Sequence, residues 1–292
     1  MDRVDLLHCP AQTAPPITSC PFVLTVHDLI PLRMDDGLSA EEVVRFRKAF
    51  ARSVNSAVRI VAVSEFTRHD LLREFPSVEK KVDVVHWGIQ PQNGLPDTDE
   101  WRSFSDLFGI RRPYFVAFGG DSRRKNVIGI LHAFKMFLAE VDRNVQLLLL
   151  GVPADAMARV SRVAMTLELN DELIQVGYAP ESLLPALLGD SEAVIYASMY
   201  EGFGLPILEA MAAGAPIITS SLTSMPEVAG NAALFVDPED PASIKEAMRT
   251  IYLNEPVKFQ MRELGAQRLK AFTWERAAES TVAVYRQALA EA

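Results

Sequence analysis

Short apolar runs alternate with amphipathic stretches along most of the 292 residues, and this alternation restricts the possible folds more than any other feature. Tyr114–Phe118 and, after Gln146, Leu147–Leu150 are continuously hydrophobic runs, as in strands that are buried on both faces. Stretches with helical spacing, such as Val127–Val141, lie between them. Alternating strands and helices predict an α/β fold with parallel sheets that are covered by helices, and ligands of such sheets bind beyond the carboxyl ends of the strands.

The expected elements follow directly from these runs. We expect strands at Val4–Leu7, Phe22–Val26, Ile60–Val63, Val82–His86, Tyr114–Phe118, Gln146–Leu150, Leu173–Val176, Ala193–Ala197, Pro216–Thr219 and Ala233–Val236. We expect helices at Glu41–Val54, Phe66–Phe75, Val127–Val141, Ala154–Leu169, Glu181–Leu188 and Leu205–Ala213, and two further helices within Glu255–Ala292.

A linker divides the chain. Gln90–Glu100 carries two prolines and a turn-forming Asn-Gly pair and has no periodicity. We therefore expect a first domain at 1–90, a second at 91–272, and a final helix at 273–292 with Thr273 as its N-cap.

Composition excludes several classes of protein. The net charge of −9 argues against nucleic acid as a partner, because binding to phosphates needs clustered Lys and Arg. Two cysteines are too few for a disulfide framework, which favours a reducing compartment. The chain has no apolar run long enough to span a membrane, and its start does not read as a signal peptide. We expect a cytoplasmic protein, and peripheral contact with the inner membrane face stays open.

The run Glu201-Gly-Phe-Gly-Leu-Pro-Ile-Leu-Glu209 follows an expected strand and opens an expected helix. Gly202 and Gly204 allow the backbone to approach a ligand closely, and the helix start offers free N–H groups and the positive end of its dipole. Glu209 falls about one turn inside the helix, where its carboxylate could accept hydrogen bonds from a diol. The alternative is that both glutamates only complement the helix dipole.

A second loop carries cations. Gly119-Gly-Asp-Ser-Arg-Arg-Lys-Asn126 follows the strand Tyr114–Phe118, and backbone N–H groups of paired glycines can form a concave anion site. Arg124 can donate two hydrogen bonds to a phosphate and Lys125 adds a point charge. A solvated basic turn is the alternative for this segment taken alone.

Two patterns that could suggest a metal are not accepted as sites. Asp97-Thr-Asp99 lies in the linker with no strand before it, and His8 and Cys9 have no second pair at ligand spacing. We treat His8 and Cys9 as residues at the edge of the core.

The glutamate run resembles the Glu-x7-Glu signature of retaining GT-B glycosyltransferases of family 4 (glycosyltransferase group 1, mannosyltransferase-like). The Phe118–Asn126 segment resembles the diphosphate-binding loop of the same family, and Leu24–Pro31 resembles its active-site histidine region. Ile60–Thr67 also matches the family, with Ser64 as the N-cap of the next helix. The resemblance implies a GT-B-like fold of two Rossmann-like domains with parallel sheets.

The resemblance also implies site residues, position by position. The catalytic residues would be His27, which faces the donor sugar in the family, with Arg124, Lys125 and Glu201, and Asp28 would lie close by. Glu201 would hold sugar hydroxyls and Glu209 the ribose. The residues implied to bind the donor are Gly119, Gly120, Tyr178, Leu183, Gly202, Phe203, Gly204, Leu205 and Glu209, with Tyr178 and Leu183 at the nucleobase.

The expected activity is transfer of a mannose-like hexose from a GDP- or UDP-sugar to a hydroxyl of a glycan or lipid-linked acceptor, with retention, in polysaccharide or glycolipid biosynthesis. No cofactor and no metal are expected, because protein cations would stabilise the departing diphosphate. The alternatives are a GT-B sugar-nucleotide epimerase or hydrolase, and a non-catalytic or partner-dependent subunit that binds a nucleotide sugar.

The resemblance begins late in the first domain. Val4–Leu7 corresponds to a strand well inside the family's first domain, so we expect the N-terminal domain to be incomplete, with an open sheet edge. A truncated gene model, or a fragment of a longer protein, is the favoured interpretation. Two other interpretations remain. A partner chain could complete the domain, or the shortened protein could bind a donor without turning it over.

Overall fold

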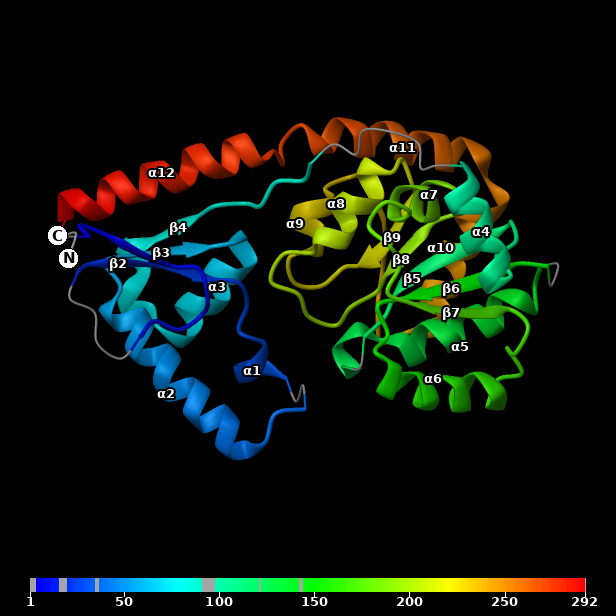
Figure 1. Ribbon diagram of the computed structural model, residues 1–292, viewed down its shortest axis with the longest axis horizontal. Coiled ribbons are helices and arrows are strands. Elements are labelled where there is room, and N and C mark those ends of the chain that lie inside the picture. The colour runs from blue at the N-terminus through cyan, green and yellow to red at the C-terminus, as the bar shows by residue number, and fades with distance from the viewer. Residues whose placement is uncertain are drawn as a thin grey trace. The chain divides into compact units, whose positions relative to one another are not determined.

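The computed structural model describes residues 4–15, 20–34, 37–90, 98–120, 122–141 and 144–291. Its strands form two sheets, and the strand pairs are parallel throughout. The chain divides into two compact units (Figure 1). The first unit contains Met1–Gln90, Glu201–Phe203 and Phe272–Ala292, and the second contains Pro91–Tyr200 and Gly204–Ala271. The α/β architecture with parallel sheets is therefore confirmed.

The first unit is built on a four-stranded sheet in the order β1-β2-β3-β4. Its elements are β1 (Leu7–Cys9), β2 (Phe22–Val26), α1 (Ile30–Arg33), α2 (Ala40–Ser56), β3 (Arg59–Ala62), α3 (Glu65–Glu74), the 3-10 helix η1 (Pro76–Lys81), β4 (Val82–Val84) and α12 (Trp274–Glu291).

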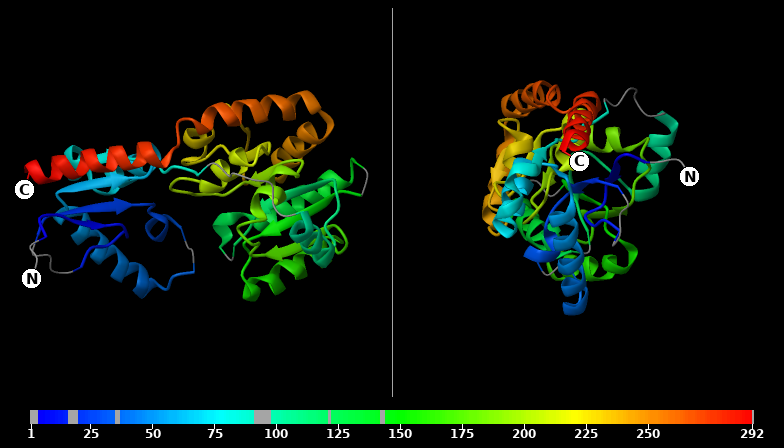
Figure 2. Two further views of the ribbon diagram at one scale, coloured as in Figure 1. Left: turned by 45° about the horizontal axis from the view of Figure 1, so that its top comes forward. Right: turned by 90° about the vertical axis from the view of Figure 1, so that its left-hand side faces the viewer.

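Side chains on the two faces of this sheet pack into two cores. Leu24 and Ile60 face α2, where Phe50 fills the core. Val23 and Val61 face the other way, where they pack with residues of α12. In Figures 1 and 2 α12 runs along the sheet. Helices therefore cover both faces, as the continuous apolar strands predict.

The second unit is built on a six-stranded sheet in the order β10-β9-β8-β5-β6-β7. Its elements are α4 (Thr98–Phe108), β5 (Tyr114–Phe118), η2 (Arg123–Lys125), α5 (Val127–Leu138), β6 (Gln146–Leu150), α6 (Ala154–Thr166), β7 (Leu173–Gly177), α7 (Leu184–Gly189), β8 (Val194–Tyr196), α8 (Leu205–Ala212), β9 (Ile217–Ser220), α9 (Met225–Ala229), β10 (Leu234–Val236), α10 (Pro241–Leu253) and α11 (Glu255–Leu269).

The main core of this unit lies between one sheet face and the helices α5, α6 and α10. Phe115 and Ile195 of the central strands meet Phe134 of α5 there. On the opposite face, Tyr114 donates its hydroxyl hydrogen to the carbonyl of Leu187 in α7 at 3.1 Å. β5 lies between β6 and β8, so the ends of β5 and β8 are neighbours.

Most expected elements are found within a few residues of their predicted bounds, and the exceptions have physical reasons. The first strand covers Leu7–Cys9 instead of Val4–Leu7, because pairing with Phe22–Val26 places Leu7 opposite Phe22. The linker prediction overlapped α4, which begins at Thr98; residues 91–97 lie outside the described residues. The helix α10 was not predicted, although Asp240 caps it and Pro241 stands at its first position.

Candidate active site

Two loops of the second unit come together because their strands are neighbours. β5 pairs with β8, with Val116 opposite Val194, so the loop that follows β5 lies beside the turn that follows β8. The amide of Met199 donates to the carbonyl of Arg124 at 2.8 Å, and Arg124 Nη1 donates to the carbonyl of Tyr200 at 3.1 Å. One backbone hydrogen bond and one side-chain hydrogen bond thus connect the cationic loop to the segment just before the glutamate run.

Lys125 is held over β8. Its Nζ donates to the hydroxyl of Tyr196 at 3.0 Å and lies 4.8 Å from the centre of that ring. Ser122 accepts a hydrogen bond from the amide of Arg124, which orders the turn. Asn126 has a left-handed conformation and donates its side-chain amide to the carbonyl of Pro238. These contacts fix Arg124 and Lys125 at the carboxyl ends of the central strands, as predicted for this loop.

Gly119 and Gly120 leave β5 in tight surroundings. A Cβ atom on Gly119 would lie 2.5 Å from Val152 Cγ2, and the amide of Gly119 donates to the carbonyl of Leu150. The sequence predicts a concave anion site from the backbone N–H groups of these two glycines. The N–H of Gly119 is used in the hydrogen bond to Leu150, and the anion site stays a prediction.

The glutamate run opens α8 as predicted. Gly204 is the N-cap residue in the left-handed region with φ 108°, and Leu205 and Pro206 form the first turn. Glu209 is half-buried one turn further on. Burial raises the pKa of Glu209, Glu181 raises it further, and Lys125 lowers it. The charge of Lys125 therefore acts on the Glu209 carboxyl group, and a joint role of the two residues at a donor stays a prediction.

The residues expected at the nucleobase have different surroundings. Tyr178 is 80 % exposed and Leu183 is 1 % exposed in the core. Their role at the nucleobase stays a prediction.

Glu201, Gly202 and Phe203 pack with the first unit. Phe203 is buried against Trp87 and Phe272, with ring centres 5.5 and 5.9 Å away. Glu201 is 9 % exposed. Phe203 therefore has an aromatic packing role. The contact of Phe203 with a donor, which the family resemblance implies, stays a prediction.

Gly202 touches the backbone of His27. A Cβ atom on Gly202 would lie 1.7 Å from the carbonyl oxygen of His27, so any side chain is excluded there. The carbonyl of Gly202 accepts hydrogen bonds from Ser64 Oγ at 2.6 Å and from Thr67 Oγ1 at 2.9 Å. Nothing in the local sequence pattern signals these contacts, since Ser64 lies 138 positions from Gly202.

His27 follows β2 at its carboxyl end. Its Nε2 lies 2.6 Å from the carbonyl oxygen of Pro10, which makes Nε2 the donor and leaves Nδ1 as an acceptor. Nδ1 is buried and has no hydrogen-bond partner among the described residues. The ring packs against Trp87 at 5.2 Å. A buried acceptor of this kind can take a hydrogen bond from a ligand hydroxyl.

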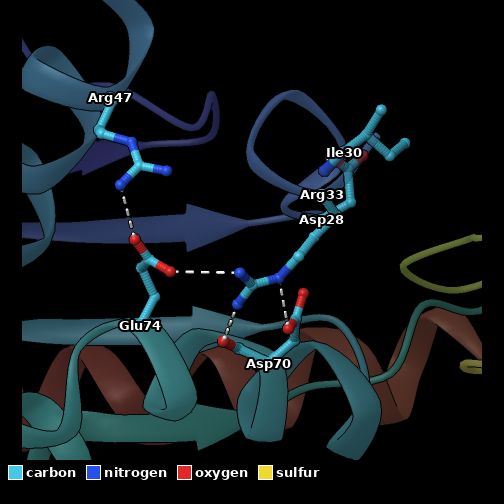
Figure 3. A network of polar contacts seen from close by, with 6 residues as sticks. All are labelled: Asp28, Ile30, Arg33, Arg47, Asp70 and Glu74. Atoms are coloured by element: carbon cyan, nitrogen blue, oxygen red, sulfur yellow. Dashed lines mark hydrogen bonds and ion pairs between the residues drawn. The ribbon is translucent and has the colours of Figure 1, made fainter. Parts of the chain in front are cut away.

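Asp28 and the short helix α1 after it are anchored locally (Figure 3). Asp28 Oδ1 accepts from the amide of Ile30 at 3.0 Å and from the side chain of Gln12 at 3.1 Å. Arg33 donates to Asp70 Oδ1 at 2.8 Å and to Glu74 at 3.2 Å, as the dashed lines in Figure 3 show. The two hydrogen bonds that Asp28 Oδ1 accepts give Asp28 a structural function.

A cavity of about 440 Å³ in the first unit has His27 in its lining. His8 also lines this cavity, and both of its ring nitrogens form hydrogen bonds. Nδ1 lies 2.6 Å from the hydroxyl of Tyr285, and Nε2 lies 2.8 Å from the hydroxyl of Thr25. Burial lowers the pKa of His8, and the nearby His27 lowers it further. His8 therefore bridges β2 and α12, which goes beyond the edge position predicted from sequence.

No metal site can be built from the described part of the chain, where no cluster of three or more His, Cys, Asp or Glu side chains occurs. Metal-independent chemistry stays a prediction. Within the same residues, no helix combines the length and the apolar character that crossing a membrane requires.

Two family profiles match the chain. "Glycosyl transferases group 1" matches residues 101–268. "Glycosyltransferase Family 4" matches residues 2–93.

Individual relatives agree with the family profiles. The chain is 27 % identical over 275 residues to O-antigen chain mannosyltransferase B of Escherichia coli, covering 90 % of this chain and 70 % of the relative. It is 24 % identical to the serotype-specific mannosyltransferase WbdA of the same organism over 94 % of its own length, but it spans only 34 % of WbdA. A solved structure of Anabaena HepE with UDP and glucose matches 91 % of this chain and 72 % of its own, with a TM-score of 0.78 at 16 % identity. This likeness identifies the fold as GT-B.

Proposed function

Since the chain belongs to the glycosyl transferases group 1 family, we propose that it moves a mannose-like hexose from a nucleotide-diphosphate sugar to an acceptor hydroxyl, with retention at the anomeric carbon. One observation carries the proposal. Arg124 and Lys125 lie at the carboxyl end of β5, beside the turn that leads to Glu209, and the Lys125 charge acts on that carboxyl group. Such a pairing suits a diphosphate next to a ribose diol, because cations attract the phosphates and a carboxylate accepts hydrogen bonds from the diol.

The proposed roles in the second unit follow from charge. Arg124 and Lys125 stabilise the negative charge that develops on the departing diphosphate, and fixed cations at such a position are among the larger catalytic contributions. Their contacts to Tyr200 and Tyr196 hold them in place before the donor arrives. Glu209 accepts hydrogen bonds from the ribose hydroxyls when it is ionised.

The proposed roles in the first unit concern the sugar. The Glu201 carboxylate holds sugar hydroxyls, and Nδ1 of His27 accepts a hydrogen bond from one of them. The mannose-like hexose and a place in polysaccharide or glycolipid synthesis are inferred from the O-antigen mannosyltransferase relative. GDP- and UDP-sugars are both candidate donors.

The test is turnover of GDP-mannose and UDP-glucose by the purified chain, with and without lipid-linked or free oligosaccharide acceptors. We expect acceptor-dependent release of the nucleoside diphosphate, and an NMR coupling constant of the product that shows the anomeric configuration of the donor. Lys125→Ala should lower kcat about 100-fold or more, because one donor to a developing charge is worth about 3 kcal/mol. Lys135→Ala on α5 is the matched control, since Lys135 pairs with Glu168 outside the loop and should leave kcat unchanged.

Other outcomes identify the alternatives. Donor consumption without an acceptor would indicate an epimerase or hydrolase. Tight nucleotide binding without any turnover would indicate a non-catalytic subunit. Wild-type turnover by the Lys125→Ala protein would remove the proposed role of this lysine.

A further inference from the structure

Two buried hydroxyl groups hold the glutamate run at Gly202. Ser64 and Thr67, at the start of α3, have no exposed surface. Ser64 Oγ donates to the carbonyl oxygen of Gly202 at 2.6 Å and Thr67 Oγ1 donates to the same oxygen at 2.9 Å. Ser64, Thr67 and the Gly202 carbonyl are called the hydroxyl clamp below. All three belong to the first unit.

The clamp uses hydrogen-bonding capacity that helix capping leaves over. Ser64 is the N-cap of α3, and its oxygen accepts a hydrogen bond from the amide of Thr67 at 3.0 Å. Capping needs only this acceptor function. A serine hydroxyl also has one hydrogen to donate. Two acceptors lie within its reach, Thr67 Oγ1 at 3.1 Å and the Gly202 carbonyl oxygen at 2.6 Å, and the shorter contact is to Gly202. One side chain thus serves the helix and the glutamate run together.

The clamp also reaches His27. Thr67 Oγ1 lies 3.3 Å from the carbonyl oxygen of His27, the atom that a Cβ on Gly202 would approach to 1.7 Å. The backbones of His27 and Gly202 are therefore in direct contact, and the same threonine touches both. Glu201 directly precedes the clamped Gly202 in the chain and is 9 % exposed.

We propose that Ser64 and Thr67 are positioning residues, which set the place of the Glu201 carboxylate relative to His27. The proposal rests on the proposed function, in which both groups contact the donor sugar. Neither hydroxyl touches the substrate. Their effect is on how well Glu201 is ordered, so losing the clamp should slow the chemical step more than it weakens donor binding, which the second unit supplies through Arg124, Lys125 and Glu209.

The decisive variant is Thr67→Val. It keeps the shape of threonine and removes the hydroxyl, and it leaves the α3 cap intact because the cap uses the Thr67 backbone amide. We expect kcat to fall about tenfold, as for a lost buried hydrogen bond, while the donor KM changes less than about twofold. Thr67→Ser restores the hydroxyl and should restore kcat. Hydrogen exchange of the amides at 200–204 should become at least about tenfold faster in Thr67→Val, since the clamp no longer restrains local opening.

Two matched controls separate positioning from stability. Ser39 caps α2 in the same unit through Glu42 and makes no contact with Gly202, so Ser39→Ala tests loss of a cap. Ser53 is 1 % exposed and bonds Ala49 and Ala14, so Ser53→Ala tests loss of a buried hydroxyl in the same unit. Both should leave kcat and exchange at 200–204 at wild-type values.

These experiments test the positioning role of Ser64 and Thr67 separately from the proposed transferase function. A wild-type kcat in Thr67→Val overturns the positioning proposal, whether or not hydrogen exchange at 200–204 changes. A loss of kcat in Ser53→Ala as large as that in Thr67→Val also overturns it. If the wild-type chain transfers no sugar, the proposed function fails. Exchange at 200–204 then decides the clamp: faster exchange in Thr67→Val alone supports it, and unchanged exchange overturns it.

Discussion

The Glu209 carboxyl group, just after the glycine turn, has a pKa that its surroundings shift. It stands one turn inside α8, half-buried, with Glu181 and Lys125 acting on it in opposite directions. Burial dominates and raises its pKa. A carboxyl group with a raised pKa favours the folded state only while it is protonated, so stability falls as the pH rises from the ordinary range of a glutamate through the raised value.

Glu209→Gln should therefore raise the melting temperature at pH 7 to 8 and leave it unchanged at pH 4, where the glutamate is protonated in both states. Glu140→Gln is a control of opposite sign, because the hydrogen bond from Lys245 lowers the pKa of Glu140. That variant should lose stability at neutral pH and match the wild type only below the lowered pKa. Differential scanning fluorimetry across this pH range checks both, and a Glu209→Gln protein that melts lower at pH 8 would contradict the assignment.

At the scale of elements, sequence patterns work where the cause is local. Phe22–Val26 and Tyr114–Phe118 are found as predicted, because short, mostly apolar runs rich in β-branched and aromatic residues favour buried strands. Ser64 is confirmed as an N-cap, because capping depends only on the first turn of the helix, where its side chain accepts a hydrogen bond from the amide of Thr67. The first strand was misplaced because its partner strand sets its position. The clamp on Gly202 was not foreseen, because no local pattern encodes a contact between residues 138 positions apart.

The short helix α1 is anchored in part by Arg33, which forms ion pairs with Asp70 and Glu74. Asp70 is 5 % exposed and its carboxylate accepts from Arg33, which is 22 % exposed. An Asp70→Ala variant keeps the contacts of this guanidinium to Glu74 and to the backbone carbonyl of residue 70 but removes the more deeply buried carboxylate (Figure 3). We expect Asp70→Ala to lower the free energy of unfolding by roughly 2 to 3 kcal/mol. Arg47 contacts the same Glu74 but is 55 % exposed, so Arg47→Ala should cost roughly 0.5 kcal/mol or less. Urea unfolding followed by circular dichroism measures both, and equal losses would show that burial does not decide them.

At the scale of the whole molecule, the two units have separate cores. Phe50 lies in the core of the first unit between the four-stranded sheet and α2, and Phe134 lies in the core of the second between the six-stranded sheet and α5. Both side chains are fully buried. Sequence composition alone could indicate a chain long enough for two cores, but the assignment of Glu201–Phe203 to the first unit depends on its aromatic neighbours and on the clamp.

Separate cores predict separate unfolding. Phe50→Ala and Phe134→Ala should each destabilise their own unit by about 3 to 5 kcal/mol. Both cysteines, Cys9 and Cys20, are free and lie in the first unit, so thiol labelling in urea reports on that unit alone. Phe50→Ala should lower the urea midpoint of labelling, and Phe134→Ala should leave it close to wild type. Equal shifts in both variants would mean that the units unfold as one.

The chain enters the first unit three times, at Met1–Gln90, Glu201–Phe203 and Phe272–Ala292. A recombination event with a single crossover near residue 90 would therefore combine the first sheet of one parent with the glycine run and the final helix of another. Val23 and Val61 would meet a foreign α12, and Ser64 and Thr67 a foreign Gly202. The contacts within the first unit are therefore preserved in such a hybrid only if all three segments come from one parent.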